Sequence, residues 1–417
     1  MREMKDSGVP WIGEIPKEWM VCRIKHVLMP GKDGIKIGPF GSSLTNKVNG
    51  EGVYKIYGQW NIVNKDFSAG KNYVSEETFE ELRNYMVYTG DVLISMMGTI
   101  GKCAIIPCDI QPGIMDSHVI KARLDKSLFI DRYFERVFDK DNSSIVYEQM
   151  QKGKKGSIMD GLNSSIVKNL IIPFPSIDEQ QRIADFLDAK CAELDTILDN
   201  TRASIEDYKA LKLSVITKAV TKGIRENRQM KESGVEWIGE IPEEWVLSRV
   251  KRHIIITNGS DPVMEGDIPV YGSGAESFKT CGEFKEGPTV LIGRKGATLH
   301  IPHYIEGRYW NVDTSFDTKP IDDFSIRYFY YLACSFDYKR YISQTTLPSM
   351  TQSCYENMDI PLLPAFEQQE IAAYLDEKCA AIDSLIASKE ALITELEAYK
   401  KSIIYEYVTG KKEVPDA

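Results

Sequence analysis

The segment "MKDSGVPWIGEIPKEW" occupies residues 4–19, and "MKESGVEWIGEIPEEW" occupies residues 230–245 of the 417-residue chain. The two segments are 226 residues apart (4 to 230), and the similarity continues through Arg23 and Lys25, which recur as Arg249 and Lys251. A repeat of this fidelity indicates two copies of one structural module. The sequence therefore predicts a duplicated unit.

A second repeated segment closes each copy. The stretch "IIPFPSIDEQQRIADFLDAKCAELD" (171–195) returns as "DIPLLPAFEQQEIAAYLDEKCAAID" (359–383), now at an offset of 188 residues. The second copy is therefore 38 residues shorter between its shared ends (226 minus 188). Few residues match in between: Val92, Leu93, Ile94, Gly98 and Asp116 align with Val290, Leu291, Ile292, Gly296 and Asp313.

The divergent middle of each copy has a strand-rich pattern. Short apolar runs such as "GDVLISMMG" and "PTVLIGRKG" are bounded by Gly and Pro, which is typical of strands. We expect an α+β protein with two α/β domains that have β-rich cores, and helices over 76–87, 128–139 and 324–341. The predicted division is 1–175 (first globular domain, with repeat segment 4–26), 176–228 (first helical region), 229–363 (second globular domain, with repeat segment 230–252) and 364–417 (second helical region).

A long helix follows each globular part. The first begins near Asp178, and apolar residues then recur at spacings of three and four, which predicts a coiled-coil seam. The predicted seam residues are Ile183, Leu187, Cys191, Leu194, Leu198, Ile205, Tyr208, Ile371, Leu375, Cys379, Ile382, Ile386, Ile393, Leu396 and Tyr399. We expect the two helices to pair as an antiparallel coiled coil. The alternative is that each helix packs only on its own domain.

Charge, cysteine usage and termini narrow the class of protein. The net charge is −10, and the acidic excess lies in residues 171–417, so a DNA-binding surface would have to be local. The first residues lack the apolar stretch of a signal peptide, and no run reaches the roughly 18 apolar residues of a membrane span; we expect a cytoplasmic protein with no membrane partner. Eight cysteines without a C-x-x-C pair favour reduced thiols, and we interpret Cys191 and Cys379 as small buried apolar residues.

Catalytic and metal-binding patterns are missing from the sequence. The "GTIGKC" stretch around Lys102 lacks the spacing of a phosphate-binding loop. His300 and His303 are the one close histidine pair, and the surrounding sequence offers no further ligands for a metal. We therefore predict no catalytic residues and no metal site. A duplicated, diverged domain on paired helices instead suits two different recognition surfaces, and DNA half-sites about 34–36 Å apart fit that geometry.

Several motifs together resemble one known family. They are "SGVPWIGEIPKEW", "IGPFGSSL" (37–44), "GDVLISMMGTIGKC" (90–103), "EQQRIADFLD" (179–188) and "YVTGKKEV" (407–414). Over essentially the whole chain they resemble the specificity subunits of type I restriction-modification systems.

The resemblance implies a non-catalytic subunit that binds double-stranded DNA. Each of two target-recognition domains would read one half of a bipartite, asymmetric site, and an antiparallel coiled coil would set the spacer. Two adenine methyltransferase (modification) subunits would dock along the helices, and restriction (translocase and nuclease) subunits would join them. The chain itself would bind no cofactor, because S-adenosylmethionine, ATP and Mg²⁺ would belong to these partners.

Polar and basic loop residues are the candidates for DNA contacts, because such side chains read base edges. In the first copy they are Ser42, Ser43, Asn46, Lys47, Gln59, Asn61, Lys102, Lys152, Lys154 and Lys155. In the second copy they are Asn258, Ser260, Tyr271, Ser273, Arg294, Lys295, Asn311 and Thr346. The basic loop "QKGKKGS" (151–157) is predicted to contact phosphates rather than bases.

Two points stay open on the sequence alone. The second copy lacks a counterpart of much of 32–75, including "GPFGSSLTNKVNGEG", so its loops cannot be derived from those of the first copy. The alternative function is a two-headed coiled-coil adaptor whose globular domains bind proteins instead of DNA.

Overall fold

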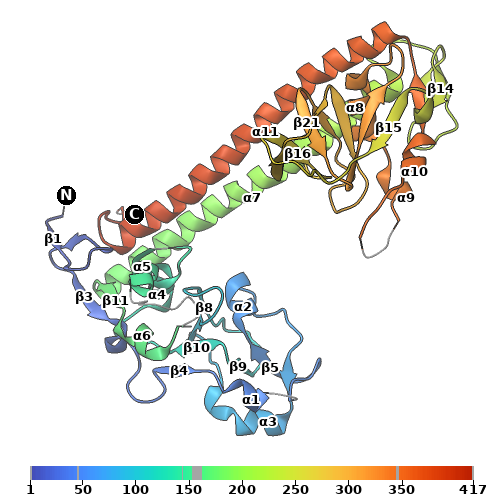
Figure 1. Cartoon of the computed structure of the whole chain (residues 1–417). Helices are drawn as coiled ribbons and strands as arrows, with labels where there is room; N and C mark the ends of the chain where they lie inside the picture. The colour runs from blue at the N-terminus through green and yellow to red at the C-terminus, as the bar shows by residue number, and fades with distance from the viewer. Residues whose placement is uncertain (1, 45–46, 143, 153–161, 344–346, 416–417) are drawn as a thin grey trace. The chain divides into compact units, whose positions relative to one another are not determined.

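The computed structural model describes residues 2–44, 47–142, 144–152, 162–343 and 347–415. The chain forms two compact units (Figure 1). Unit 1 combines residues 1–200 with 392–417, and unit 2 contains residues 201–391. Each unit thus holds one globular domain and one end of each long helix. The division of the sequence into four consecutive domains stays a prediction, because the compact units divide both long helices between them.

Two sheets form the core of unit 1. The first has the strand order β4-β10-β7-β8, and the second has the order β6-β5-β9, in which β5 and β9 are parallel. All four residues of β7 and of β10 are buried, as is typical of strands covered on both faces. The strands are β4 (Ile35–Ile37), β5 (Tyr54–Tyr57), β6 (Tyr73–Val74), β7 (Val92–Ser95), β8 (Cys103–Ile105), β9 (Gly113–Met115) and β10 (Val119–Ala122).

Unit 2 repeats this arrangement. Its sheets have the orders β15-β22-β19-β20 and β17-β16-β21-β18, and β16 pairs with β21 in parallel, as β5 does with β9. The strands are β15 (Ile254–Asn258), β16 (Ile268–Tyr271), β17 (Lys279–Cys281), β18 (Lys285–Glu286), β19 (Thr289–Gly293), β20 (His303–Ile305), β21 (Arg308–Asn311) and β22 (Ser315–Pro320). The expected strand-rich cores are confirmed in both halves.

The repeated segments form small antiparallel pairs at corresponding places. In unit 1, β1 (Met4–Asp6) pairs with β2 (Glu14–Pro16), and β3 (Met20–Arg23) pairs with β11 (Ile171–Phe174). In unit 2 the same pairs are formed by β12 (Met230–Glu232) with β13 (Glu240–Pro242) and by β14 (Val246–Arg249) with β23 (Asp359–Leu362). The two repeated sequences of each copy therefore meet in space.

Helices complete both units. They are α1 (Gly41–Leu44), α2 (Gln59–Asn64), α3 (Glu76–Glu81), α4 (Asp131–Phe138), α5 (Ser144–Lys152), α6 (Ser164–Asn169), α7 (Ile177–Lys222), α8 (Ile326–Ser335), α9 (Tyr338–Tyr341), α10 (Gln352–Glu356) and α11 (Ala365–Val408), with single 3₁₀ turns at Ile24–His26, Arg83–Tyr85 and Val250–Arg252. The helix predicted over 324–341 is broken because Phe336 adopts an extended backbone. The ring centroids of Phe336 and Trp237 lie 5.7 Å apart in an edge-to-face arrangement. The helix predicted over 76–87 likewise ends at Glu81 and continues as a 3₁₀ turn.

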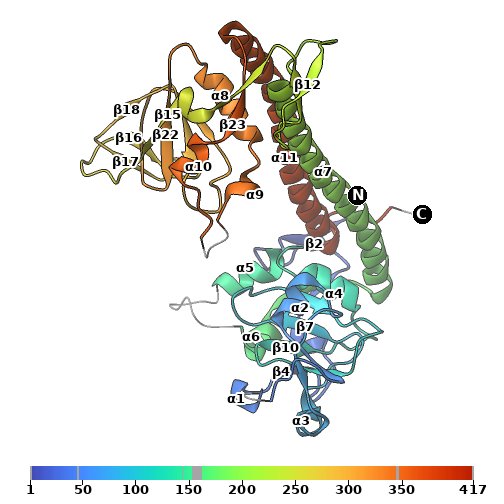
Figure 2. The same cartoon turned by 90° about the vertical axis from the view of Figure 1, so that its right-hand side faces the viewer.

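The long helices α7 and α11 lie side by side and antiparallel within each unit (Figures 1 and 2). In unit 1, Lys400 donates to Asp195 at 2.5 Å, and in unit 2, Lys212 donates to Asp383 at 2.6 Å. These two ion pairs are copies of one another, because both residues of each pair differ from their counterparts by the 188-residue offset. The predicted antiparallel pairing is confirmed.

Part of the seam also packs in the cores of the globular domains, so the predicted alternative, in which each helix packs on its own domain, is present as well. Ile183, Leu187 and Cys191 belong to the hydrophobic core of unit 1, and Ile371, Leu375 and Cys379 belong to that of unit 2. Leu194, Leu198, Ile205 and Ile382 are buried, whereas Tyr208, Ile386, Ile393 and Leu396 are half-buried. Tyr399 is 48% exposed and the adjacent Lys400 pairs with Asp195 of α7, so the assignment of Tyr399 to the seam stays a prediction.

A buried carboxylate fixes the start of each long helix. In unit 1, Trp19 donates its Nε1 to Glu179 at 2.8 Å, and Arg2 forms an ion pair with the same carboxylate. In unit 2, Trp245 donates to Glu367 at 3.1 Å, and Arg228 forms the ion pair. Burying a carboxylate is costly unless it is paired and hydrogen-bonded. The tryptophan belongs to the repeated segment, and the arginine stands two residues before that segment in both copies.

We expect Glu367→Gln to lower the free energy of unfolding of unit 2 by about 3 kcal/mol, because it leaves Arg228 without its buried partner. Thermal unfolding of the full chain measures the change. Glu370→Gln is the matched control: it removes an exposed ion pair with Arg225, and such pairs contribute less than about 1 kcal/mol. Equal effects of the two substitutions would contradict the structural role of Glu367.

Candidate nucleic-acid interface

In unit 1, four chain segments meet at one end of the sheets. The backbone N–H of Asp116 donates to Tyr57 O (2.9 Å), and that of Met96 donates to His118 O (3.2 Å). The N–H of Gly38 donates to Val119 O (2.9 Å). The loops that follow β4, β5 and β7 are thereby tied to the residues just before β10 and to its first residue, Val119. We call these loops, residues 38–44, 58–61, 96–102 and 116–118, the first loop cluster.

Unit 2 contains the same arrangement. Val312 N–H donates to Tyr271 O (3.0 Å), Arg294 N–H to Thr314 O (2.8 Å) and Gly259 N–H to Ser315 O (3.2 Å). Residues 259–264, 271–274, 294–298, 312–314 and 347–350 form this second loop cluster; the last segment joins through Met350 N–H to Arg294 O at 2.9 Å.

These bonds correct the alignment of the two copies. They match Asp116 with Val312, so its predicted alignment with Asp313 is wrong by one residue. They also show that 32–75 has more of a counterpart than the sequence indicated: β15 and β16 correspond to β4 and β5, and Gly259 corresponds to Gly38. The parts of this region without an equivalent are the helical insertions α1 and α2.

A glycine is required in the loop after β4 and in the loop after β15, where each loop crosses the backbone that leads into β10 or β22. A Cβ atom at Gly38 would collide with the carbonyl oxygen of Asp116, and one at Gly259 would collide with that of Val312. The close approach of the two backbones therefore depends on glycine at both positions. This contact holds the same loops together in two units whose side chains differ.

The first loop cluster presents polar and aromatic side chains. Ser42 is exposed, Ser43 is half-buried on α1, and Gln59 is half-buried at the start of α2. Lys47 is in an ion pair with Glu81 at 2.6 Å. A cavity of about 610 Å³ opens beside these residues, lined in part by Gln59, Trp60, Asn72 and Asp116.

The exposed aromatic residues of this cluster were not among the predicted DNA contacts. Phe40 is 85% and Trp60 is 56% exposed, although apolar rings of this size usually pack in a core. The signal was available, since Phe40 is flanked by Pro39 and Gly41, and Trp60 follows a glycine-bounded strand end. In unit 2, Val263, Phe278 and Leu347 are exposed in or beside the second loop cluster.

The two basic residues predicted to contact DNA in the second copy, Arg294 and Lys295, lie in the second loop cluster. Lys295 lies 3.4 Å from Asp313, and the Arg294 guanidinium donates to Asp313 O at 3.3 Å. Ser273 and Thr298 share a hydrogen bond at 3.3 Å. Asn258 and Ser260 are exposed, and Tyr271 is half-buried. These residues thus converge from three separate loops.

Three predicted contacts receive structural roles instead. Asn61 is buried and donates to Asp66 O and Ala69 O, and Asn311 is buried and donates to Ser315 O. Lys102 is mostly buried in an ion pair with Asp141, and burial lowers the pKa of its ammonium group. Loop asparagines and lysines look alike in sequence whether they stabilise the loop or face outward. Asn46, Lys154, Lys155 and Thr346 lie outside the described residues, as does the side chain of Lys152 on α5.

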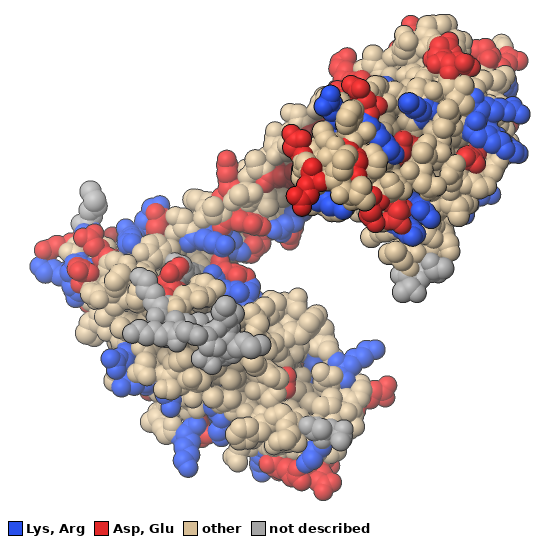
Figure 3. Space-filling view, in the orientation of Figure 1, with Lys and Arg blue, Asp and Glu red and all other residues tan. Residues whose placement is uncertain are grey.

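Charge and metal-ligand groups are distributed as follows. Acidic and basic side chains are interspersed along the exposed parts of the two long helices (Figure 3). Within the described ranges there is no group of three or more His, Cys, Asp or Glu residues that could hold a metal ion. Cys191 and Cys379 are buried among apolar residues, as predicted. No helix in the part of the chain that the structure describes is long and apolar enough to cross a membrane.

The duplicated loop clusters and the paired helices define a family. The family model described as "Type I restriction modification DNA specificity domain" matches residues 16–207 and 247–398. The two matches cover most of the chain, one in each copy. The chain belongs to this family, and the resemblance inferred from the motifs is confirmed.

Known relatives agree with this assignment. A putative type I restriction enzyme MjaX specificity subunit of Methanocaldococcus jannaschii is 25% identical over 430 residues, covering 96% of this chain and 95% of the relative. The MjaVIII specificity subunit of the same organism is 25% identical over 336 residues, covering 72% and 75% of the two chains.

Solved structures share the fold. A chain from work on "complex assembly and conformational transition of the type I R-M system" superposes with a TM-score of 0.71 at 16% identity, covering 95% of this chain and 99% of the other. The HsdS subunit from Thermoanaerobacter tengcongensis superposes with a TM-score of 0.53 at 16% identity, covering 95% and 98%.

We expect Gly38→Ala to destabilise unit 1 by about 1–3 kcal/mol, because the added methyl group forces the backbone of the first loop cluster apart. Chemical denaturation of the full chain measures this change. Gly41→Ala, three residues further on, is the control: its Cβ meets no heavy atom of the described residues within 4 Å. A neutral Gly38→Ala would mean that the loops do not depend on this contact.

Proposed function

We propose that this chain is the DNA-reading subunit of a type I restriction-modification complex and that each loop cluster reads one half of a bipartite, asymmetric target. The observation that supports this most strongly is the repetition of one loop framework with different side chains. Arg294 and Lys295 of the second cluster stand where the first has Met96 and Met97, and Ser273 and Gly274 stand where the first has Gln59 and Trp60. Two different surfaces on one framework suit two different half-sites.

In this proposal the paired helices set the spacer between the half-sites and dock two modification subunits. The segments that contain the helices carry the acidic excess: residues 171–248 hold 15 Asp and Glu against 10 Lys and Arg, and residues 359–417 hold 12 against 6. The helices are therefore poor DNA-binding surfaces, because they would repel phosphates. Protein partners fit such surfaces better. Restriction subunits would then join the complex through the modification subunits or beside them.

The chain would contribute recognition and no chemistry. The relatives are named as specificity subunits, and the sequence lacks nucleotide-binding and nucleophile motifs. S-adenosylmethionine, ATP and Mg²⁺ would be bound by the partners. Isolated chain should accordingly show no turnover with S-adenosylmethionine or ATP.

Selection from a random DNA pool tests the proposal. Purified chain, together with its modification subunits, should enrich one asymmetric sequence with two conserved parts and a fixed spacer, detected by mobility shift and sequencing. Enrichment of no sequence, combined with capture of a protein by the globular domains, would favour the two-headed adaptor instead.

Single substitutions should affect one half-site each. We expect Gln59→Ala to relax the preference at the first half-site and Arg294→Ala to relax it at the second, costing about 1–3 kcal/mol where the lost contact is bidentate. Site selection with each variant provides the measurement. Lys319→Ala, at the other end of β22 from the second loop cluster, is the control and should leave both half-sites unchanged. Relaxation of both half-sites by one substitution would contradict separate reading.

The helices should act as a ruler. Seven residues inserted between Ala203 and Ser204 keep the seam in phase and lengthen α7 by about 10 Å, or about three base pairs. Methylome sequencing of cells that express this variant with its partners should show both half-sites retained with a longer spacer, or loss of activity. Full activity on the original spacer would count against the ruler.

A half-length chain should form a dimer in which each copy completes the core of unit 1 in the other. In unit 1 the end of α11 contributes Ile403, Ile404 and Val408 to the core, and α7 carries Val215, Ile216 and Val220 at the corresponding positions. We therefore expect residues 1–228 to form a twofold-symmetric dimer that, with modification subunits, selects an inverted repeat of the first half-site. Light scattering and site selection measure both properties. A monomer at tens of micromolar, or selection of an asymmetric site, would show that the halves are not interchangeable in assembly.

A further inference from the structure

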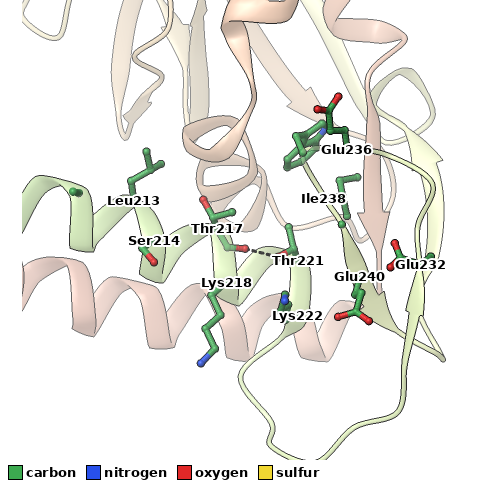
Figure 4. A pocket seen from close by; sticks show the side chains of 13 residues that line it. Leu213, Ser214, Thr217, Lys218, Thr221, Lys222, Glu232, Glu236, Ile238 and Glu240 are labelled. Atoms are coloured by element: carbon green, nitrogen blue, oxygen red, sulfur yellow. Dashed lines mark hydrogen bonds between the residues drawn. The ribbon is translucent and has the colours of Figure 1, made fainter.

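A cavity of about 800 Å³ lies in unit 2, between the last turns of α7 and the repeated segment of the second copy. Figure 4 shows Thr217 and Thr221 on the α7 side and Ile238 on the opposite side, with Lys218 pointing away. Leu213, Trp237 and Gly239 also line it. We call this cavity the helix-end pocket.

The corresponding position in unit 1 is filled by the chain itself. Tyr405 is the counterpart of Thr217 at the 188-residue offset, and its hydroxyl donates to Ile12 O at 3.0 Å. Lys411 donates to that hydroxyl at 2.8 Å and lies 4.2 Å from the centre of the ring. A tyrosine with a lysine beside it therefore closes this site in unit 1.

Gly13 and Gly239, which occupy equivalent positions, show that the site is filled in unit 1 and open in unit 2. A Cβ atom at Gly13 would lie 3.5 Å from Lys411 Nζ and 3.9 Å from the Tyr405 hydroxyl. A Cβ atom at Gly239, the counterpart of Gly13, meets no heavy atom of the described residues within 4 Å. The same framework is thus covered in unit 1 and uncovered in unit 2.

The residues around the helix-end pocket suit an aromatic side chain with a basic neighbour. Leu213 is 50% exposed at its mouth, where the first unit has the polar Lys401. Glu232, Glu236 and Glu240 contribute carboxylates from the repeated segment, and Lys218 and Lys222 line the pocket from α7. Glu236 is already paired with Arg340 at 2.8 Å, so Glu232 and Glu240 are the carboxylates that favour a cation from a docked partner. The volume exceeds that of one phenol ring, which leaves room for the neighbouring residues of a docked segment.

We propose that the helix-end pocket is a docking socket for a tyrosine that a partner protein carries next to a lysine or arginine. The partner's tyrosine takes the place in unit 2 that Tyr405 takes in unit 1, with its hydroxyl donating to Ile238 O and its basic neighbour facing the glutamates. Naming the partner rests on the proposed function: it is the modification subunit bound to unit 2.

The socket can be tested without DNA or partners. The full chain is labelled with 5-fluorotryptophan, the ¹⁹F resonance of Trp237 is assigned with Trp237→Phe, and p-cresol is titrated as the tyrosine side-chain probe. We expect a saturable shift of the Trp237 resonance in the wild type and in Thr217→Ser, and none in Thr217→Tyr, whose ring fills the pocket. No shift in the wild type would overturn the proposal.

The partner is tested by assembly. Titration of the full chain with purified modification subunits, followed by native mass spectrometry, should show two subunits bound to the wild type and to Thr217→Ser. Thr217→Tyr should weaken binding of one of them by about tenfold or more, the loss typical of a buried aromatic anchor. Equal binding by both variants would overturn the proposal, even if p-cresol binds, and would leave the proposed function intact.

Two further outcomes are distinguishable. Concentration-dependent dimerisation of the full chain that Thr217→Tyr abolishes would assign the pocket to a second copy and overturn the proposal. Failure of the wild type to bind any modification subunit would count against the proposed function, and with it against the named partner, whereas the p-cresol result would still decide whether the pocket accepts a phenol.

Discussion

The rest of the structure depends on a buried carboxylate at the start of each long helix. Glu179 and Glu367 each accept a hydrogen bond from a tryptophan and pair with an arginine. A buried carboxylate that lost either partner would be strongly unfavourable, so the repeated segment, the strand pair and the helix start must assemble together. This requirement accounts for the tryptophan and the arginine that recur at the 226-residue offset in both copies.

The second constraint is that each unit is completed by a helix end from the other half of the sequence. In unit 1 the hydroxyl of Tyr133 donates to Val408 O at 2.9 Å, and in unit 2 the hydroxyl of Tyr328 donates to Val220 O at 3.3 Å. The C-terminal turns of both long helices therefore lie in a hydrophobic core rather than at a frayed end. Neither half of the chain contains all the residues of one core, which ties the folding of the two halves to each other.

This framework separates what is constant from what varies. The helix starts, the strand pairs and the glycine crossings recur in both units, while the loop clusters and the helix-end pocket differ. Loops anchored by backbone hydrogen bonds tolerate side-chain exchange, because the bonds do not involve the side chains. Recognition surfaces can thus change without changing the fold.

The sequence alone determined the duplication, the strand-rich cores, the antiparallel helices and the family, because repeats and hydrophobic periodicity are local patterns. The tertiary structure decided which polar residues face outward: Asn61 and Asn311 bond inward, whereas Phe40 and Trp60 are exposed. It also matched Asp116 with Val312, and it revealed a pocket beside Thr217. In unit 1 the side chain of Tyr405 fills the equivalent space. These properties depend on contacts between residues far apart in the chain, so neither spacing nor composition encodes them in a form that can be read locally.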